Sequence, residues 1–261
     1  MSRRKQASAL DRALAERVAG VGRWLSAYLD NPDEGAIHGV RIAIRRLEAA
    51  YHLYPESAQT PASKGYMRRL RAFFRQNGEV RDCDVLREKL LGRGLSGDDA
   101  LLIKLGERRA RHLADAVRQA PPLLALDEVR TVSSAPDPLP RYLHRVRKLA
   151  SRFLDKRPAV IRHESDAEDV HAMRKAAKKL YYTLELELES VSEHLLETIK
   201  QFHRLSGSLH DSDVAIAFLH DNRRRSGKAL LKAERRQRHE TCTELQRLLS
   251  EEDWEGMLAF P

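Results

Sequence analysis

The sequence predicts an all-α protein, and three observations predict it. Apolar residues recur every three or four positions along most of the 261-residue chain, as they do on one face of an α-helix. No stretch keeps the alternation of apolar and polar residues that a half-buried strand needs. Charged residues make up 33% of the chain and aromatic residues only 6%, a balance that suits helices with wide solvated faces better than β-sandwiches.

The first predicted helix shows this periodicity most clearly. Its apolar residues step by three or four and are Leu10, Leu14, Val18, Val21, Leu25 and Leu29. Asn31 and Pro32 follow and end the run, because proline cannot donate a helical hydrogen bond. The same stepping predicts further helices over 37–54, 66–76, 98–119, 141–154, 170–188, 194–205 and 228–249.

Prolines mark a boundary in the middle of the chain. Five of the ten fall between residues 121 and 140, where they interrupt any helix. We therefore expect a first helical bundle over 1–120, a Pro-rich connection over 121–140 and a second helical bundle over 141–261.

The two halves carry related segments in the same order. Three pairs match, at offsets of 133, 129 and 127: HGVRIAIRRL (38–47) with HAMRKAAKKL (171–180), FFRQNGEVRDCDV (73–85) with FHRLSGSLHDSDV (202–214), and ERRARH (107–112) with ERRQRH (234–239). The second pair agrees at six of thirteen positions. Three colinear matches indicate an internal duplication in which helices are kept and loops vary in length.

The chain is basic and rich in arginine. Lys and Arg number 47, of which 35 are Arg, against 38 acidic residues, so the formal net charge is +9 and the isoelectric point about 9.7. Such a charge attracts polyanions, and the planar guanidinium group suits phosphate oxygens. The alternative is that Arg serves here as a good helix former whose long stem covers apolar surface.

Cysteine use and hydropathy indicate the compartment. Cys83 and Cys242 stand far apart and neither forms a CxxC pair, which excludes a disulfide framework and a thiolate zinc site. No apolar run approaches the roughly 20 residues of a membrane span. We expect a soluble protein of the reducing cytoplasm that has no membrane partner.

The duplicated histidine motif places cations on one side of a helix. At about 100° per residue, His38, Arg41 and Arg45 share one face, and the apolar residues of the motif lie on the opposite face. The second half repeats this face with His171, Arg174 and Lys178, while Arg46 and Lys179 lie to the side of their helices.

A second cationic stripe follows in the next predicted helix of each half. It consists of Arg68, Arg71 and Arg75, and Lys200 and Arg204 match the last two. A single such stripe is most often a solvated helix face. Like charges at this spacing cost about 0.2–0.5 kcal/mol per pair, so stripes that occur twice favour an anionic partner that relieves the repulsion.

Paired aspartates raise the question of metal or acid–base chemistry. Asp82 and Asp84 follow Gly78, and Asp211 and Asp213 follow Gly207. We expect each glycine to end a helix, the first Asp of each pair to cap the next helix, and the second to lie in its first turn, where it could hold a neighbouring Arg. The alternative is a divalent metal held by these carboxylates.

Signatures of enzymes and cofactors are missing from the sequence. His38 and His171 lie in different halves and belong to no HExxH or His/Cys cluster, so we expect no metal. The chain has no G-x-x-x-x-G-K-[ST], GxGxxG or GxSxG motif, so we expect no cofactor and no catalytic residue.

The duplicated His-x-x-Arg helix and the Gly-x-x-Arg-Asp-x-Asp-Val segment resemble the CHAD domain, the conserved-histidine α-helical domain. The resemblance covers nearly the whole chain and implies one domain over 1–261. It implies two bundles of about four to five helices each, related by a pseudo-twofold axis, around a basic central channel that binds inorganic polyphosphate. CHAD domains often stand beside a CYTH triphosphatase domain, for which no residues remain here, so a stand-alone binding module is implied.

The resemblance and the second stripe together give a set of expected polyphosphate-binding residues. They are His38, Arg41, Arg45, Arg46, Arg71, Arg75, His171, Arg174, Lys178, Lys179, Lys200 and Arg204. Lysines replace the arginine pair in the second motif, and His210 stands where the first half has Arg81, so the halves need not bind phosphate equally.

We therefore expect a non-catalytic module that binds inorganic polyphosphate in the cytoplasm, with polyphosphate granules as a candidate location. A nucleic-acid-binding helical protein is the first alternative, with nucleic acid as the competing partner, although aromatic residues for base stacking are sparse. A metal-dependent phosphohydrolase that uses the paired aspartates is the second. The sequence leaves the oligomeric state open.

Overall fold

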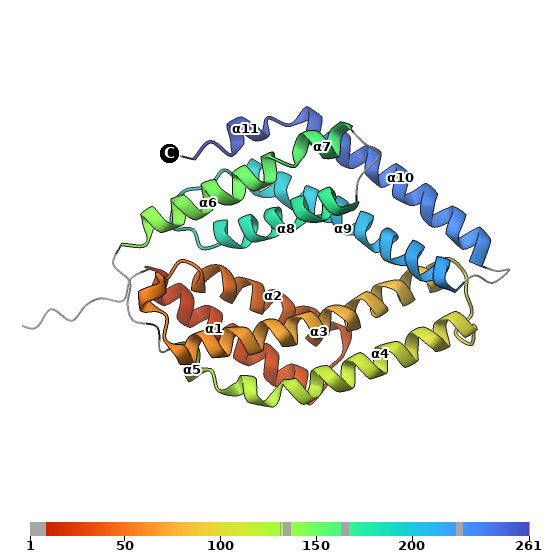
Figure 1. The fold of residues 1–261 in the computed structure, drawn as a ribbon, viewed down its shortest axis with the longest axis horizontal. Coiled ribbons are helices and arrows are strands. Elements are labelled where there is room, and N and C mark those ends of the chain that lie inside the picture. The colour runs from red at the N-terminus through yellow and green to blue at the C-terminus, as the bar shows by residue number, and fades with distance from the viewer. Residues whose placement is uncertain (1–8, 131, 133–136, 163–166, 223–226, 261) are drawn as a thin grey trace, which may run out of the picture. The chain divides into compact units, whose positions relative to one another are not determined.

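A computed structural model of the chain describes residues 9–130, 132, 137–162, 167–222 and 227–260. Every regular element in these ranges is a helix, which confirms the all-α prediction. The long helices are α1 (Ala9–Asp30), α2 (Glu34–Tyr51), α3 (Pro61–Gly92), α4 (Ala100–Gln119), α6 (Leu139–Leu154), α8 (Ala167–Leu184), α9 (Glu193–Asp221) and α10 (Gly227–Glu251) (Figure 1). The short ones are η1 (Glu56–Ala58), η2 (Pro121–Leu124), α5 (Asp127–Arg130), α7 (Arg157–Arg162) and α11 (Trp254–Met257).

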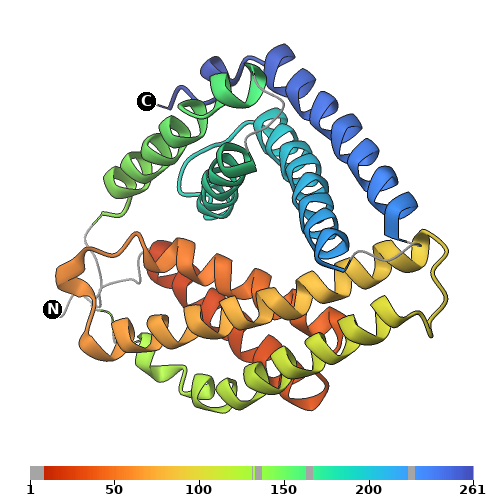
Figure 2. The same cartoon turned by 45° about the vertical axis from the view of Figure 1, so that its right-hand side comes forward.

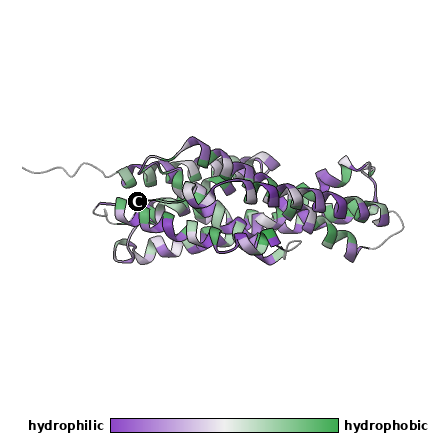
Figure 3. Cartoon of the chain, turned by 90° about the horizontal axis from the view of Figure 1, so that it is seen from above, coloured by the Kyte–Doolittle hydropathy of each residue, from purple (hydrophilic) through white to green (hydrophobic). Residues whose placement is uncertain are grey.

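The helices are amphipathic, as the sequence periodicity predicts. Hydrophilic and hydrophobic residues lie side by side along most of them (Figure 3). Within the described parts of the chain, no helix is both long and apolar enough to cross a membrane.

The chain forms two compact units. The first comprises residues 1–84, 105–142 and 185–189, and the second comprises 85–104, 143–184 and 190–261. Two segments therefore depart from a division at the proline-rich connection: the tip of the α3–α4 hairpin belongs to the second unit, and residues 185–189 belong to the first. The pseudo-twofold relation between two bundles stays a prediction.

The first unit is built around the packing of α1 against α2, which lie side by side (Figure 2). Asp33 caps α2, because its carboxylate accepts a hydrogen bond from the amide of Ala36 at 2.8 Å. The rings of Tyr28 and Phe73, both fully buried, meet edge to face with centroids 5.2 Å apart. The fully buried residues Ile37, Val40, Ile44 and Leu47 fix the rotation of α2 and thereby the direction of its cationic face.

The second unit packs α8 against α9 and α9 against α10. Phe153 of α6 meets Phe202 of α9 at a centroid distance of 5.0 Å and Trp254 of α11 at 4.7 Å. All three rings are buried, so α11 contributes Trp254 to this core.

Two helices run through positions where the sequence predicted a break. The expected helix ends at Gly78 and Gly207 are wrong, because α3 continues from Pro61 to Gly92 and α9 from Glu193 to Asp221. The predicted caps at Asp82 and Asp211 are wrong for the same reason, since both residues lie inside these helices. Gly78 instead allows a close approach of Arg41, whereas Gly207 lies in ordinary contact with Arg174.

Two equivalent ion pairs fix the register of the duplication. Asp84 accepts a hydrogen bond from Arg109 at 2.5 Å, and Asp213 accepts one from Arg238. The prediction that Asp84 and Asp213 hold a neighbouring Arg is thus confirmed, whereas their predicted place in the first turn of a helix is wrong, because both lie inside α3 and α9. In both pairs the two partners are 25 residues apart, so the α3–α4 and α9–α10 hairpins are related by an offset of 129. The match of ERRARH with ERRQRH has an offset of 127 and therefore differs from the structural alignment by two residues.

The duplication extends to the first helix of each half. Buried residues of α1 and α6 follow the same spacing at an offset of 128, and pair Leu14 with Tyr142, Val18 with Val146, Val21 with Leu149 and Leu25 with Phe153. In this register Trp24 of α1 is equivalent to Arg152 of α6.

Candidate anion-binding site

In the first unit the histidine motif of α2 packs beside α3. Arg41 donates a hydrogen bond from Nη1 to the carbonyl of Phe74 at 2.7 Å. Its guanidinium carbon lies 4.2 Å from the centroid of the Phe74 ring, and that of Arg45 lies 5.0 Å from it. Phe74 therefore supports two guanidinium groups of the motif through cation–π contacts.

A glycine makes room for this arrangement. A Cβ atom on Gly78 would lie 3.3 Å from Nη1 of Arg41, closer than an ordinary van der Waals contact. Gly78 of the second sequence motif therefore packs directly against the guanidinium group of Arg41 of the first motif. In the first unit this contact brings the two motifs together.

His38 lies among positive charges. Packing of neighbouring side chains removes water from its ring and lowers its pKa below the usual value, and the charges of Arg81, Arg45 and Arg41 lower it further. Glu34 acts in the opposite direction and is ion-paired with Arg81. The site therefore combines several cations with the carboxylate of Glu34.

The second unit repeats the arrangement with other residues. A Cβ atom on Gly207 of α9 would lie 4.0 Å from Nη2 of Arg174 of α8. His171 stacks on His210, with ring centroids 5.8 Å apart and planes inclined by 30°. His210 takes the position of Arg81, so each unit places a basic side chain of the second motif beside the motif histidine.

Both histidines of the second unit have lowered pKa values. For His171 the causes are loss of solvent and then the charges of Lys175, Arg174 and Lys178. For His210 loss of solvent again comes first, followed by the charge of Arg174, while Asp211 acts in the opposite direction. Both rings therefore lose their charge at a lower pH than an exposed histidine does.

Arg81 and His210 were recognised in the sequence as equivalent positions of the second motif, but neither was among the residues expected to bind polyphosphate. The structure places both beside a motif histidine. Phe74 was missed because nothing in the sequence places it under the arginines.

Three of the side chains expected to bind phosphate are paired with carboxylates of the protein instead. Arg46 makes a bidentate pair with Glu185, at 2.8 and 2.9 Å. Arg71 pairs with Glu48 at 2.7 Å, and Lys200 pairs with Glu197 at 2.5 Å. A phosphate would have to displace these carboxylates, so a role of these cations as phosphate ligands stays a prediction.

The remaining expected residues differ in exposure. Arg75 and Arg204 are exposed on α3 and α9, as is Arg68. Lys178 is half-buried on the face of His171, and Lys179 is exposed on the side of α8 that faces α6.

The paired aspartates do not gather into a metal site in the described ranges. No group of three or more His, Cys, Asp or Glu residues there has a geometry that could hold a metal ion. Two of the four carboxylates, those of Asp84 and Asp213, are bound to Arg109 and Arg238.

Comparisons with known proteins show the family and the fold of this chain. The family model described as CHAD domain matches residues 12–220. The crystal structure of the CHAD domain from the plant Ricinus communis superposes with a TM-score of 0.64 at 19% sequence identity, and the match covers 96% of this chain and 89% of that chain. At this identity the superposition shows a common fold. No curated protein matches the sequence.

Proposed function

The chain belongs to the CHAD domain family, and from this premise and the geometry of its basic faces we propose that it binds inorganic polyphosphate without chemical turnover. The observation that carries the proposal is the repeated placement of a motif Arg on a glycine, Arg41 on Gly78 and Arg174 on Gly207, beside a histidine that is surrounded by cations.

The geometry suits a flexible anion without base or sugar. Arg41 and Arg45 are held by Phe74 before any ligand arrives, so less side-chain entropy is lost when phosphate oxygens bind. Charge-assisted hydrogen bonds and release of counterions from the polymer would drive association.

Nucleic acid is the competing ligand. Proteins that bind single strands stack bases on aromatic rings, but the ring of Phe74 is already covered by two guanidinium groups. This arrangement favours phosphate chains over exposed bases. Within the proposal the protein acts in the cytoplasm, where polyphosphate granules would offer the ligand.

A binding role also fits the engagement of the aspartates. A phosphohydrolase would need a carboxylate cluster near the basic faces to hold a divalent metal. Asp84 and Asp213 instead neutralise arginines of the neighbouring helices.

Titration of the full chain with long-chain polyphosphate tests the proposal, with a DNA duplex and a single-stranded RNA of matched charge as competitors. We expect polyphosphate to displace both nucleic acids at moderate salt, and we expect no release of phosphate in the presence of magnesium or manganese. Displacement of polyphosphate by nucleic acid, or phosphate release that Asp84→Asn abolishes, would replace the proposal with one of its alternatives.

A further inference from the structure

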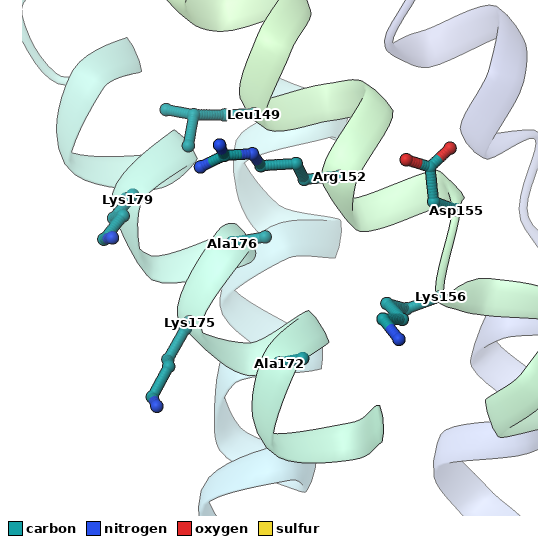
Figure 4. Close-up of a pocket in the computed structure, with 8 residues that line it drawn as sticks. All are labelled: Leu149, Arg152, Asp155, Lys156, Ala172, Lys175, Ala176 and Lys179. Carbon is teal, nitrogen blue, oxygen red and sulfur yellow. The ribbon is translucent and has the colours of Figure 1, made fainter. Parts of the chain in front are cut away.

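A cationic pocket lies between α6 and α8 of the second unit, on a different side of α8 from His171. Its volume is about 320 Å³, which is near the lower end for small-ligand sites. Ala172 and Ala176 line it from α8, and the positively charged residues Arg152, Lys156, Lys175 and Lys179 surround it (Figure 4). Figure 4 shows Arg152 extending from α6 across the face of α8 near Ala176.

The charges around the pocket do not cancel. Lys156 is paired with Asp169 at 2.7 Å, and one further carboxylate, that of Asp155, lies at the rim. Arg152 and Lys175 are exposed, and within the described part of the chain neither has an ion-pair partner. The pocket therefore keeps a net positive charge that an anion would neutralise.

The equivalent place in the first unit is closed. Trp24, the counterpart of Arg152, packs on Gly39, the counterpart of Ala172, so tightly that a Cβ atom on Gly39 would overlap its ring. Arg46, the counterpart of Lys179, is held by both oxygens of Glu185. In the first unit, Trp24 fills this place and Glu185 neutralises Arg46. In the second unit, the same place is an open pocket lined by cations.

We propose that this pocket binds a compact group of two or three linked phosphates, separately from any polymer on the His171 face. A short phosphate chain places several negative charges within reach of cations from both helices, and alanines at the floor let it approach the backbone of α8. The same chemistry is offered by free short-chain polyphosphate and by the phosphates of a nucleotide. The inference goes beyond the proposed function, because neither His171 nor Arg174 lines the pocket.

The first unit supplies the variant that tests this. In Arg152→Trp with Ala172→Gly, the second unit receives the pair of residues that closes the first, so the pocket is filled by an arrangement that this fold already accommodates. The matched variant is His171→Ala with Arg174→Ala, which removes cations from the neighbouring face and leaves the pocket lining intact.

Calorimetric titration of the full chain with inorganic tripolyphosphate, with ATP in a second arm, gives the readout. We expect the pocket-filling variant to weaken tripolyphosphate binding by at least about tenfold, and the His171 variant to weaken it much less. Similar affinities for tripolyphosphate and ATP would show that the pocket recognises the phosphate chain alone. Clearly tighter binding of ATP would show that it recognises nucleotides.

Two results would overturn the inference: unchanged tripolyphosphate binding in the pocket-filling variant, or an equal loss in both variants. If the pocket-filling variant does not fold, as judged by circular dichroism, Arg152→Gln takes its place under the same expectations, because Arg152 lines the pocket from α6. Long-chain polyphosphate, titrated in parallel, tests the proposed function independently, because it is expected to respond mainly to the His171 variant.

Discussion

Nη1 of Arg41 lies 3.3 Å from the position that a Cβ atom on Gly78 would occupy. This contact joins the two sequence motifs of the first half into one site. The equivalent distance between Arg174 and Gly207 is 4.0 Å, which is an ordinary contact. The two units therefore differ in how closely the motif Arg approaches the glycine.

This difference predicts unequal effects of alanine at the two glycines. Alanine is favoured over glycine inside a helix by about 1 kcal/mol, so Gly207→Ala should raise the free energy of unfolding by about that amount. Gly78→Ala should gain less, because its methyl group displaces Arg41, and it should weaken polyphosphate binding more than Gly207→Ala does. Urea denaturation and titration of both variants check this, and equal losses of affinity would contradict it.

The two aspartate–arginine pairs should differ in their contribution to stability. The side chain of Asp84 is 8% exposed and that of Asp213 is 30% exposed. Removal of one partner costs more when the other is left without water, so Arg109→Ala, which leaves the buried carboxylate of Asp84 without its cation, should lower the free energy of unfolding by about 2–3 kcal/mol. Arg238→Ala leaves the more exposed Asp213 and should cost clearly less. Urea denaturation measures both, and a larger loss for Arg238→Ala would show that burial of the remaining carboxylate does not set the cost.

A buried glutamate should stabilise the second unit. Glu234 is 2% exposed and pairs with Lys89 at 2.8 Å and with Arg93 at 3.2 Å. Glu234→Ala leaves both cations without their carboxylate and should cost about 3 kcal/mol. Glu240→Ala, which removes the partner of the exposed Arg236, is the control and should cost less than about 0.5 kcal/mol. Thermal unfolding of the two variants would contradict this account if the melting temperatures fell equally.

The motif histidines predict how stability depends on pH. The folded-state pKa values of His38, His171 and His210 lie below that of an unfolded histidine, so the unfolded chain binds more protons. Stability should therefore fall as the pH decreases from about 6.5 through the lowered values. An anion bound beside these rings, as we propose for polyphosphate, would favour their protonated forms, so the affinity for polyphosphate should rise over the same interval.

Melting temperatures between pH 8 and pH 5.5, with and without polyphosphate, check both statements. The triple variant His38→Gln, His171→Gln, His210→Gln should flatten both profiles in this interval. A wild-type affinity that does not change with pH would show that the rings are not in contact with the anion.

The sequence was sufficient to predict the helices whose apolar residues recur without a break, because this periodicity is visible among residues that are close together in the chain. It was insufficient at Gly78 and Gly207, where α3 and α9 continue because tertiary packing of a long helix outweighs the cost of about 1 kcal/mol for one glycine. The pair of Arg46 with Glu185 spans 139 positions, and no local pattern indicates it. Likewise, the sequence does not indicate that Arg152, at the position equivalent to Trp24, lines a pocket between α6 and α8, because the pocket depends on how the two helices pack.

The central claim is that polyphosphate binds through the motif arginines and not through net charge. Long-chain polyphosphate affinity of Arg41→Gln with Arg174→Gln, compared with Arg118→Gln with Arg236→Gln, tests it most directly. The second pair removes the same charge from side chains that are 72% and 81% exposed. We predict at least about a tenfold loss for the first variant and less than about a twofold loss for the second; equal losses would contradict the account.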